Sequence, residues 1–576
     1  MKILLTAINA KYIHSNLAVY SLKAYAQSFC ASQNKMEQKD PVCENVRIEI
    51  AEYTINQQLD HILMDIYKKK PDMLCFSCYI WNIVYVEEIV REIKKIYPCL
   101  SIWLGGPEVS YDAKEVLQRL PEAEGVMKGE GEETFAHLAA GEDKSKITGI
   151  TYRDHEGTIQ ENPWRKAMDL SKVPFIYRDI KEFEHKIIYY ESSRGCPFSC
   201  SYCLSSIDKK LRFRELELVK KELQFFIDQK VPQVKFVDRT FNCNHAHAMS
   251  IWKFLAEHDR GMTNFHFEIS ADMLNDEEVA LIQSMRPGLI QLEIGVQSTN
   301  TETIREIRRT MNFGEVAKIV RAIQKNGNVH QHLDLIAGLP YENMESFAKS
   351  FDEVYALKPQ QLQLGFLKVL KGSYMEEQKE NYGLVYKSQP PYEVLYTKWL
   401  GYGEVLRLKG IEEMVELYYN SGQYAYTLLE LETYFDSPFE MYDRLSQYYE
   451  RQDLHLASHN RAARYEIFLG FISETVPAEE RSRYQELLTF DYYLRENAKS
   501  RPEFAGEYRL NKDEVRQFYE KEEKERKYLL SHQKYDRNQM RKMTHLERFP
   551  VLQKTVLFDY MNRNVLTKEA RTVDIS

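Results

Sequence analysis

The sequence lacks long apolar runs. No stretch of about 18 consecutive apolar residues occurs, so we expect no membrane-spanning helix and no membrane partner. The first eight residues are apolar only briefly and carry no small-residue cleavage site, so they predict a first strand and not a signal peptide. Glycine and proline are also scarce, at 24 and 18 of 576 residues, which excludes low-complexity sequence.

The sequence also has no large excess of positive or negative charge. The net charge of -9 over 576 residues gives no reason to expect nucleic-acid binding. The nine cysteines are an odd number and follow no export signal, so we expect no disulfide framework and a reducing, cytoplasmic location. The length predicts several domains.

Three of the cysteines crowd into eight residues. Cys196, Cys200 and Cys203 are spaced C-x3-C-x2-C, with Tyr202 directly before the last. Three thiolates can hold three corners of an iron–sulfur cube and leave the fourth iron open. A zinc site is one alternative, but structural zinc usually takes two C-x2-C-like pairs, and no second pair lies suitably downstream. Buried structural thiols are the other alternative.

Residues 1–150 alternate short apolar runs with stretches of helical periodicity, which predicts a doubly wound, Rossmann-like parallel sheet. Ligands bind such sheets beyond the carboxyl ends of the strands. Cys75 and Cys78 form a C-x2-C within one of these apolar runs, and we interpret Cys75 as core packing. The candidate ligand contacts at the strand ends are Asn9, Tyr12, Ser77, Gly105, Gly106, Gly129, Glu130 and Gly131.

The rest of the chain divides into three segments. Residues 151–186 contain a polar hairpin and a proline-containing connector, which predicts a linker. Residues 187–370 hold six β/α units, which predict a (β/α)6 partial barrel with its chemistry on the loops at the carboxyl ends of the strands. The three cysteines follow its first strand. Residues 371–576 predict a mostly α-helical domain whose many tyrosines we interpret as core.

The cysteine motif at the start of a six-unit β/α series resembles the radical S-adenosylmethionine (SAM) superfamily. The resemblance implies that the open iron binds SAM and that one electron from a [4Fe-4S] cluster yields a 5′-deoxyadenosyl radical. Several segments are also similar to the oxygen-independent coproporphyrinogen oxidase branch. The resemblance implies SAM contacts from Tyr202, Asp238, Glu268, Ser270, Gln297, Arg309 and Asp334.

The first region resembles the cobalamin-binding domain that precedes many radical SAM cores. The likeness rests on Gly105-Gly106-Pro107 and on Gly129-Glu130-Gly131-Glu132. The residues around His14 lack the D-x-H-x-x-G motif that supplies an axial histidine, so the resemblance implies cobalamin held without a protein imidazole. A purely structural domain is the alternative. The last region resembles an uncharacterised C-terminal extension of such proteins.

Together these resemblances imply an anaerobic enzyme that uses the cluster, SAM and cobalamin and takes electrons from a flavodoxin or ferredoxin. The expected reaction is methylation of an unactivated carbon in a small molecule or peptide. Ring contraction, cyclisation or oxidation without methyl transfer is an alternative, and a non-catalytic iron–sulfur or cobalamin sensor is another. RNA methylthiotransferases need three further cluster cysteines in their N-terminal domain, and the five N-terminal cysteines here are not spaced that way.

Overall fold

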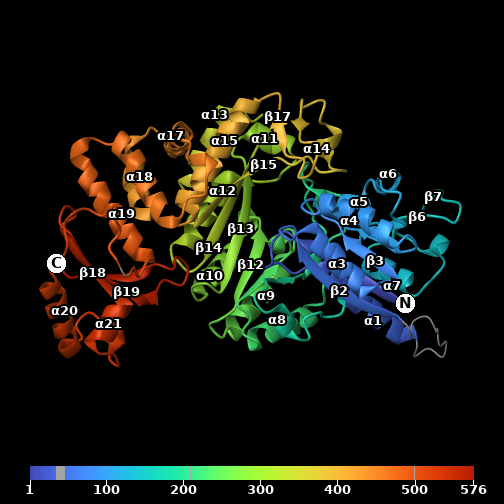
Figure 1. Cartoon of the computed structure of the whole chain (residues 1–576), viewed down its shortest axis with the longest axis horizontal. Coiled ribbons are helices and arrows are strands. Elements are labelled where there is room, and N and C mark those ends of the chain that lie inside the picture. The colour runs from blue at the N-terminus through green and yellow to red at the C-terminus, as the bar shows by residue number, and fades with distance from the viewer. Residues whose placement is uncertain (34–45, 208, 499) are drawn as a thin grey trace.

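A computed structural model describes residues 1–33, 46–207, 209–498 and 500–576 of the chain, so Cys43 lies outside the described residues. The N-terminal, central and C-terminal parts follow one another along the long axis of the molecule (Figure 1). Within the described ranges, no helix is both long and apolar enough to cross a membrane.

The first part is the predicted doubly wound sheet. Its strand order is β2-β1-β3-β4-β5-β6-β7. The parallel strands are β1 (Lys2–Asn9), β2 (Arg47–Thr54), β3 (Met73–Ser77), β4 (Ser101–Gly105) and β5 (Gly125–Met127). The main flanking helices are α1 (Leu17–Gln33), α3 (Leu59–Lys69), α4 (Ile83–Ile96), α6 (Ala113–Arg119) and α7 (Glu132–Ala139). Alternate residues of β1 enter two separate cores, Leu4 on one face and Leu5 on the other, as expected for a sheet covered on both sides.

The predicted polar hairpin joins this first sheet. Strand β6 (Ile150–Arg153) pairs antiparallel with β5, and β7 (Ile159–Glu161) pairs antiparallel with β6. The segment that runs between the two main sheets therefore begins after Glu161. It carries Trp164 back over the first sheet, where a Cβ atom at Gly129 would lie 3.3 Å from its ring.

The central part is an open, six-stranded parallel sheet in the order β15-β14-β13-β12-β11-β8, which confirms the predicted partial barrel. Its strands are β8 (Ile188–Tyr190), β11 (Gln233–Phe236), β12 (Asn264–Ile269), β13 (Ile290–Gln297), β14 (His330–Ala337) and β15 (Gln361–Phe366). The helices that follow the strands include α8 (Leu216–Asp228), α9 (His245–His258), α10 (Asp276–Ser284), α12 (Phe313–Gln324) and α13 (Met344–Tyr355). Phe265 and Phe267 pack in the helix-covered core, so the alternate residues His266 and Glu268 face the inside of the barrel.

The C-terminal part is mainly helical, as predicted. Its longer helices are α15 (Tyr402–Met414), α17 (Pro438–Arg451), α18 (Arg461–Thr475), α19 (Arg481–Arg495) and α20 (Lys512–Glu525). Tyr418, Tyr424 and Tyr442 are fully buried and form core as predicted, whereas Tyr402 and Tyr426 are about half exposed. This part covers the open edge of the barrel, because the Asn420 amide exchanges two 2.9 Å hydrogen bonds with the backbone of Leu362 in β15.

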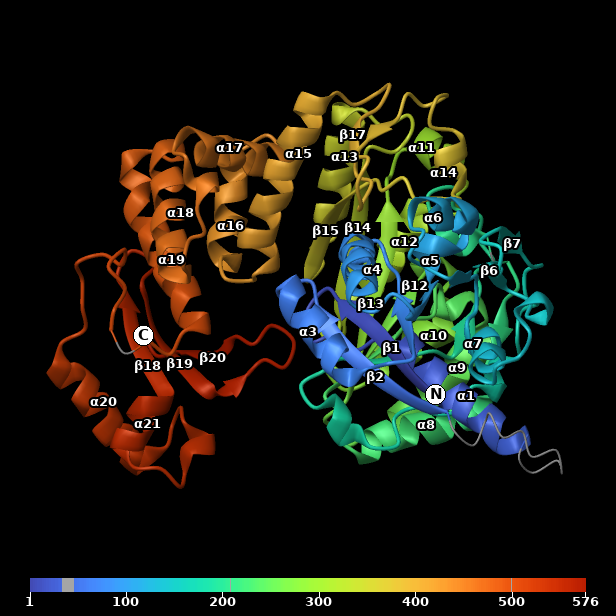
Figure 2. The ribbon, with the colours of Figure 1, turned by 45° about the vertical axis from the view of Figure 1, so that its right-hand side comes forward.

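Two local predictions in this part differ from the structure. The sequence pattern of residues 393–408 predicts a helix, but Val394–Tyr396 forms β17, which pairs with β16 (Val385–Tyr386), and α15 begins at Tyr402. A three-stranded antiparallel sheet of β18 (Thr544–Phe549), β19 (Lys554–Arg563) and β20 (Ala570–Asp574) was not expected at all (Figure 2). This sheet is covered on both faces, because Val556 and Phe558 of β19 pack into one core and Leu557 packs into another. The charged residues Glu547 and Asp559 are themselves buried.

Candidate cofactor site and active site

The three cysteines lie in the loop that follows β8. Cys196 and Cys200 are buried, Cys203 is half-buried, and none is in a disulfide. Gly195 allows the loop to turn, because its φ is +88° and a Cβ there would lie 2.5 Å from the Lys210 carbonyl oxygen. The loop is framed by β9 (Ser193–Arg194), which pairs antiparallel with β10 (Arg212–Phe213). Three free thiols held this way suit a three-cysteine iron–sulfur cluster.

Asp238 braces this loop from behind. Its carboxylate accepts hydrogen bonds from the Ser192 amide at 3.0 Å and from the hydroxyls of Ser192 and Ser193 at 2.6 Å each. Burial raises the pKa of Asp238 to about 6, although the two serines act to lower it. Asp238 is only 1% exposed and does not line the cavity described below, in contrast to the predicted contact with the SAM amine.

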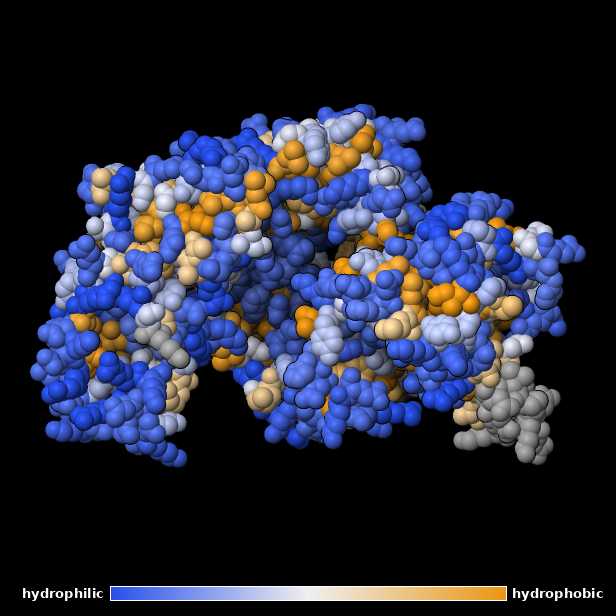
Figure 3. All heavy atoms as spheres, viewed as in Figure 1, coloured by the Kyte–Doolittle hydropathy of each residue, from blue (hydrophilic) through white to orange (hydrophobic). Residues whose placement is uncertain are grey.

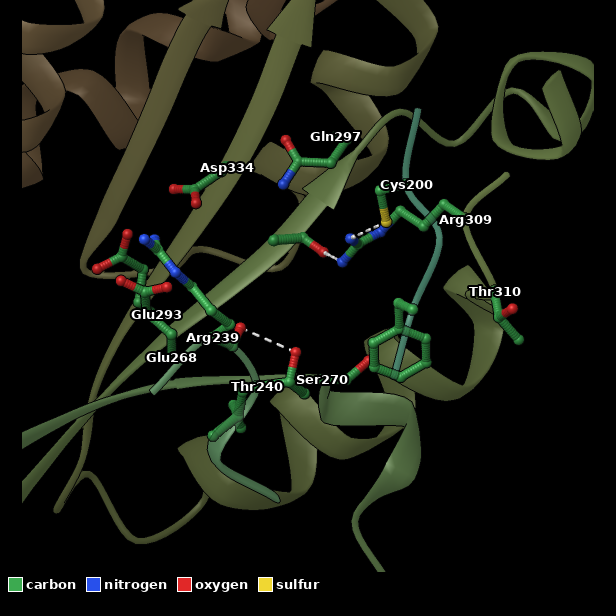
Figure 4. Close-up of a pocket in the computed structure, with 13 residues that line it drawn as sticks. Cys200, Arg239, Thr240, Glu268, Ser270, Glu293, Gln297, Arg309, Thr310 and Asp334 are labelled. Atoms are coloured by element: carbon green, nitrogen blue, oxygen red, sulfur yellow. Dashed lines mark hydrogen bonds between the residues drawn. The ribbon is translucent and has the colours of Figure 1, made fainter. Parts of the chain in front are cut away.

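A cavity of about 130 Å³ opens beside the cysteine loop, at the carboxyl ends of the barrel strands (Figure 4). Six residues predicted from the sequence line it, namely Cys200, Glu268, Ser270, Gln297, Arg309 and Asp334. The sequence analysis missed four further polar residues of the lining, Arg239, Thr240, Glu293 and Thr310. Arg239 and Thr240 directly follow Asp238, so their position after a strand was the available signal.

Arg309 joins the cysteine loop to the end of β13. Its Nη1 lies 3.3 Å from the Tyr202 hydroxyl and 3.8 Å from Cys200 Sγ, and its Nη2 donates to the Gly295 carbonyl oxygen. Figure 4 shows the guanidinium between the thiol and the strand. A guanidinium in this position can bind a carboxylate of a ligand next to the cluster site.

Gln297 combines backbone strain with an unsatisfied acceptor. Its φ is +72°, and the pairing of β13 with β14 shifts register between Gly295 and Gln297. Its buried Oε1 has no hydrogen-bond partner among the described residues. Strained residues and buried unpaired acceptors concentrate at functional sites, so Gln297 fits a contact to a ligand hydroxyl or amine.

Two carboxyl groups that line the cavity, Glu268 and Asp334, have raised pKa values. Burial raises the pKa of Glu268 to about 7, and the nearby charge of Glu293 adds to the shift. Burial also raises the pKa of Asp334, whose Oδ1 lies 2.9 Å from His332 Nε2. Ser270 is held in place, since its hydroxyl donates to Asp272 at 2.8 Å and its amide donates to Asn242 at 2.9 Å.

Two of the predicted cobalamin contacts brace loops at the carboxyl edge of the first sheet. The Asn9 amide donates to the His14 carbonyl oxygen and to Glu52, at 3.0 Å each. Ser77 accepts a 3.4 Å hydrogen bond from Asn16. These two residues shape the edge, and Tyr12 lies on it 68% exposed.

Gly105, Gly106, Gly129 and Gly131 lie together at this edge, and we call them the glycine cradle. An added Cβ atom at Gly106 or Gly131 would collide with a neighbouring residue. Gly106 has a φ of +113°, and a Cβ there would lie 2.4 Å from the Cys78 carbonyl oxygen. The carbonyl of the preceding Gly105 accepts a 2.7 Å hydrogen bond from the Cys78 amide. Gly129 has a φ of +69°, and a Cβ at Gly131 would lie 2.9 Å from Leu22. The backbone can therefore approach a ligand closely along this edge.

Aromatic residues that the sequence analysis missed surround the cradle. Trp81 stacks on Tyr79 with ring centroids 4.3 Å apart, and Tyr111 lies 6.0 Å from Trp164. Trp81, Tyr111 and Trp164 are between 38% and 49% exposed. Exposed aromatic rings beside a glycine cradle suit a large, flat ligand such as a corrin ring.

Glu130 was predicted as a cobalamin contact, but in the structure it binds the connector and the β9–β10 hairpin that frames the cysteine loop. Its Oε1 lies 2.6 Å from Arg212 Nη1, and its Oε2 accepts a 3.1 Å hydrogen bond from the Met168 amide. The next carboxylate, Glu132, pairs with Arg194 in the cysteine loop. The glycine cradle and the cysteine loop therefore face each other across the contact between the N-terminal and central parts, which we call the junction.

Comparison with known protein families agrees with this arrangement. Residues 190–354 match the radical SAM superfamily, and residues 3–139 match the B12 binding domain. The chain therefore carries a B12 binding domain followed by a radical SAM domain. Residues 380–571, which make up most of the C-terminal part, match a third family, described as a protein of unknown function (DUF4080).

Curated relatives are distant. The 2-(S-pantetheinyl)-carbapenam-3-carboxylate methyltransferase of Streptantibioticus cattleyicolor is 25% identical over 304 residues, which are 48% of this chain and 44% of that protein. The hopanoid C-3 methylase of Methylococcus capsulatus is 24% identical over 43% of this chain and 49% of its own length. The anaerobic magnesium-protoporphyrin IX monomethyl ester cyclase of Rubrivivax gelatinosus is 22% identical over 51% of this chain and 55% of its own length. The chain thus spans about half the length of these relatives.

Solved structures show the same fold. The cobalamin-dependent SAM radical enzyme OxsB with aqua-cobalamin bound covers 85% of this chain and 79% of its own length, with a TM-score of 0.58 and 15% identity. The radical SAM methyltransferase TsrM from Kitasatospora setae, with cobalamin and a [4Fe-4S] cluster bound, covers 67% of this chain and 76% of its own length. Its TM-score is 0.53 and its identity 17%.

Proposed function

We propose that this protein is a cobalamin-dependent radical SAM enzyme that methylates an unactivated carbon of a small molecule or peptide. The observation that carries the proposal is the junction itself, where a three-cysteine loop and a glycine cradle face each other. When bound, the cluster with SAM supplies a 5′-deoxyadenosyl radical, and methylcobalamin supplies a methyl group. The chain's own residues bind and orient these groups.

On the barrel side, Cys196, Cys200 and Cys203 hold the cluster and leave one iron open for SAM. Arg309 is placed to bind the SAM carboxylate, because its guanidinium already lies beside Cys200 Sγ. Gln297 and Glu268 line the cavity from β13 and β12, where they can bind the ribose or amine of SAM. Asp238 keeps the cysteine loop in position through Ser192 and Ser193.

On the other side, the glycine cradle and the exposed aromatic rings hold cobalamin. His14 lies at this edge, but its Nδ1 is 2.6 Å from the Tyr189 hydroxyl, which ties the ring to the barrel. This contact leaves Nε2 uninvolved, so the proposal that the cobalt has no protein imidazole ligand is supported by the lack of a D-x-H-x-x-G motif around His14. A cytoplasmic flavodoxin or ferredoxin would supply the electron.

A second candidate is a ring-forming or oxidising reaction without methyl transfer. It is favoured by the likeness to the Rubrivivax gelatinosus cyclase, whose coverage is comparable to that of the methyltransferases. Product mass separates the two reactions, because only methyl transfer adds one carbon.

The test is anaerobic reconstitution with iron, sulfide and cobalamin, followed by incubation with SAM and dithionite. We expect 5′-deoxyadenosine to form, and Cys196→Ala to abolish both its formation and the cluster absorbance. Cys99→Ala is the control, since Cys99 is an exposed free thiol in the first part of the chain, outside the motif. A lack of 5′-deoxyadenosine, or its persistence in Cys196→Ala, would contradict the proposal and favour a non-catalytic sensor.

A further inference from the structure

The inner face of the barrel is strongly polar, although closed parallel barrels usually fill their interior with branched apolar side chains. The parallel register places Glu268, Glu293 and His332 side by side on β12, β13 and β14. Asp334 lies two residues further along β14 on the same face. Figure 3 shows the molecule hollowed between its parts, with hydrophilic residues inside the hollow.

Three of these side chains converge on one point. Glu293, His332 and Asp334 each offer a ligand atom, and the three atoms lie within 4.8 Å of one another. His332 is only 6% exposed, and its Nε2 lies 2.9 Å from Asp334 Oδ1 without the geometry of a hydrogen bond. Ligands of a transition metal lie about 2.0–2.2 Å from the ion, so small side-chain rotations would close the group around one ion.

Glu293 is held by neighbouring polar side chains, as the carboxylate ligands of metal ions usually are. Its Oε2 lies 3.0 Å from Lys235 Nζ and 2.9 Å from His266 Nε2. Among the described residues, these contacts all fall on Oε2, so Oε1 is left for another partner. Hydrogen-bonded carboxylates next to imidazoles are typical of protein metal sites.

Arg239 lines the cavity together with these carboxylates, and its charge and that of Lys235 offset part of theirs. Lys235 pairs with Glu293, but within the described ranges neither Glu268 nor Asp334 has a lysine or arginine at ion-pair distance. Several carboxylates in one enclosed space repel each other unless a cation lies between them. A divalent ion bound by Asp334 and Glu293 would remove this repulsion.

We propose that Glu293, His332 and Asp334 form a binding site for one divalent transition-metal ion, such as Zn²⁺, inside the barrel. The mixed imidazole and carboxylate ligands match the preference of zinc and of iron(II). The ion has open positions toward the cavity, where it can hold an oxygen-rich group of the substrate. That last role rests on the proposed function, whereas the metal site does not.

Metal content of the reconstituted full-length protein tests the site, without substrate or SAM. After incubation with Zn²⁺ and gel filtration, we expect about one Zn²⁺ per chain. His332→Ala and the isosteric Glu293→Gln should each weaken Zn²⁺ binding at least about tenfold. His155→Ala is the matched control, because His155 is exposed in the turn between β6 and β7 and should bind Zn²⁺ as the parent does.

Iron content and 5′-deoxyadenosine formation, measured in the same samples, separate this proposal from the proposed function. Unchanged cluster iron in Glu293→Gln shows that the variant is folded, so a loss of Zn²⁺ there supports the site even if His332→Ala fails to fold. Absence of bound Zn²⁺ in the parent, or equal Zn²⁺ in parent and Glu293→Gln, would overturn the proposal.

Discussion

Arg194 and Glu132 join the cysteine loop to the cobalamin side of the junction. Arg194 Nη2 lies 2.5 Å from Glu132 Oε1, and Arg194 Nε lies 2.8 Å from Glu191. Arg194 is two residues before Cys196, and Glu132 begins α7 directly after the Gly129–Gly131 turn. The Glu132 side chain is only 6% exposed, so this ion pair fixes how the two proposed cofactor sites face each other.

We predict that Arg194→Ala destabilises the protein by about 3 kcal/mol, because it leaves Glu132 charged and buried without its partner. The variant should also lose cobalamin on gel filtration. Denaturant unfolding and cobalamin absorbance check the two effects. Arg91→Ala is the matched control: Arg91 is 42% exposed and pairs with Glu87 one helical turn away, so its loss should cost less than about 1 kcal/mol. Equal losses in the two variants would contradict the prediction.

The sequence predicted the fold where side-chain alternation decides it. In β12, Phe265 and Phe267 face the helices and Glu268 faces the cavity, and both facts follow from a period of two. The cysteine spacing predicted the loop, because three thiols so close in sequence must also lie close in space.

The sequence did not reveal contacts that depend on tertiary placement. Asp238 was predicted as a ligand contact at a strand end, but Ser192 and Ser193, which follow β8, occupy its oxygens. Trp164 comes from a connector and reaches the glycine cradle only because the β6–β7 hairpin returns the chain to the first sheet. The convergence of Glu293 with His332 depends on the register between β13 and β14, which no local pattern encodes.

We predict that Gly106→Ala destabilises the first domain by about 2–4 kcal/mol and abolishes cobalamin retention. An alanine there would need a left-handed φ, and its Cβ would meet the rigid Cys78 carbonyl at 2.4 Å. Gly157→Ala is the matched control, since Gly157 also has a positive φ, +82°, but a Cβ added there would have no other atom within 4 Å. That variant should cost only about 1 kcal/mol and retain cobalamin. Thermal unfolding and the absorbance of bound cobalamin report both effects, and retention of cobalamin by Gly106→Ala would refute the cradle.

We predict that Arg309→Lys weakens SAM binding at least about tenfold while the cluster forms normally. Lysine keeps the positive charge but cannot make the two parallel hydrogen bonds by which a guanidinium binds a carboxylate. Equilibrium dialysis with labelled SAM measures the affinity. The adjacent Arg308 lies over the Tyr374 ring, 3.4 Å from its centroid, so Arg308→Lys is the control that should leave SAM affinity unchanged. Equal SAM affinity in Arg309→Lys and the parent would rule out the proposed carboxylate contact.

We predict that Glu268→Gln stabilises the ligand-free protein at pH 8 but hardly changes it at pH 5. Burial, followed by the charge of Glu293, raises the pKa of Glu268 from 4.5 to about 7. Between these values the unfolded chain has already lost the proton that the folded protein keeps, so the parent loses stability as pH rises from 4.5 to 7. Above pH 7 the full deficit, about 3 kcal/mol, is present.

Glutamine does not titrate, so the Glu268→Gln variant does not lose this stability as the pH rises. Thermal midpoints of parent and Glu268→Gln should diverge as pH rises from 5 to 8, and Glu257→Gln, at an exposed position of α9, should follow the parent throughout. The same Glu268→Gln variant should bind SAM more weakly at pH 8, because the ionised carboxylate is the better acceptor for a ribose hydroxyl. A pH-independent difference between Glu268→Gln and the parent would show that the variant acts through packing and not through the carboxylate charge.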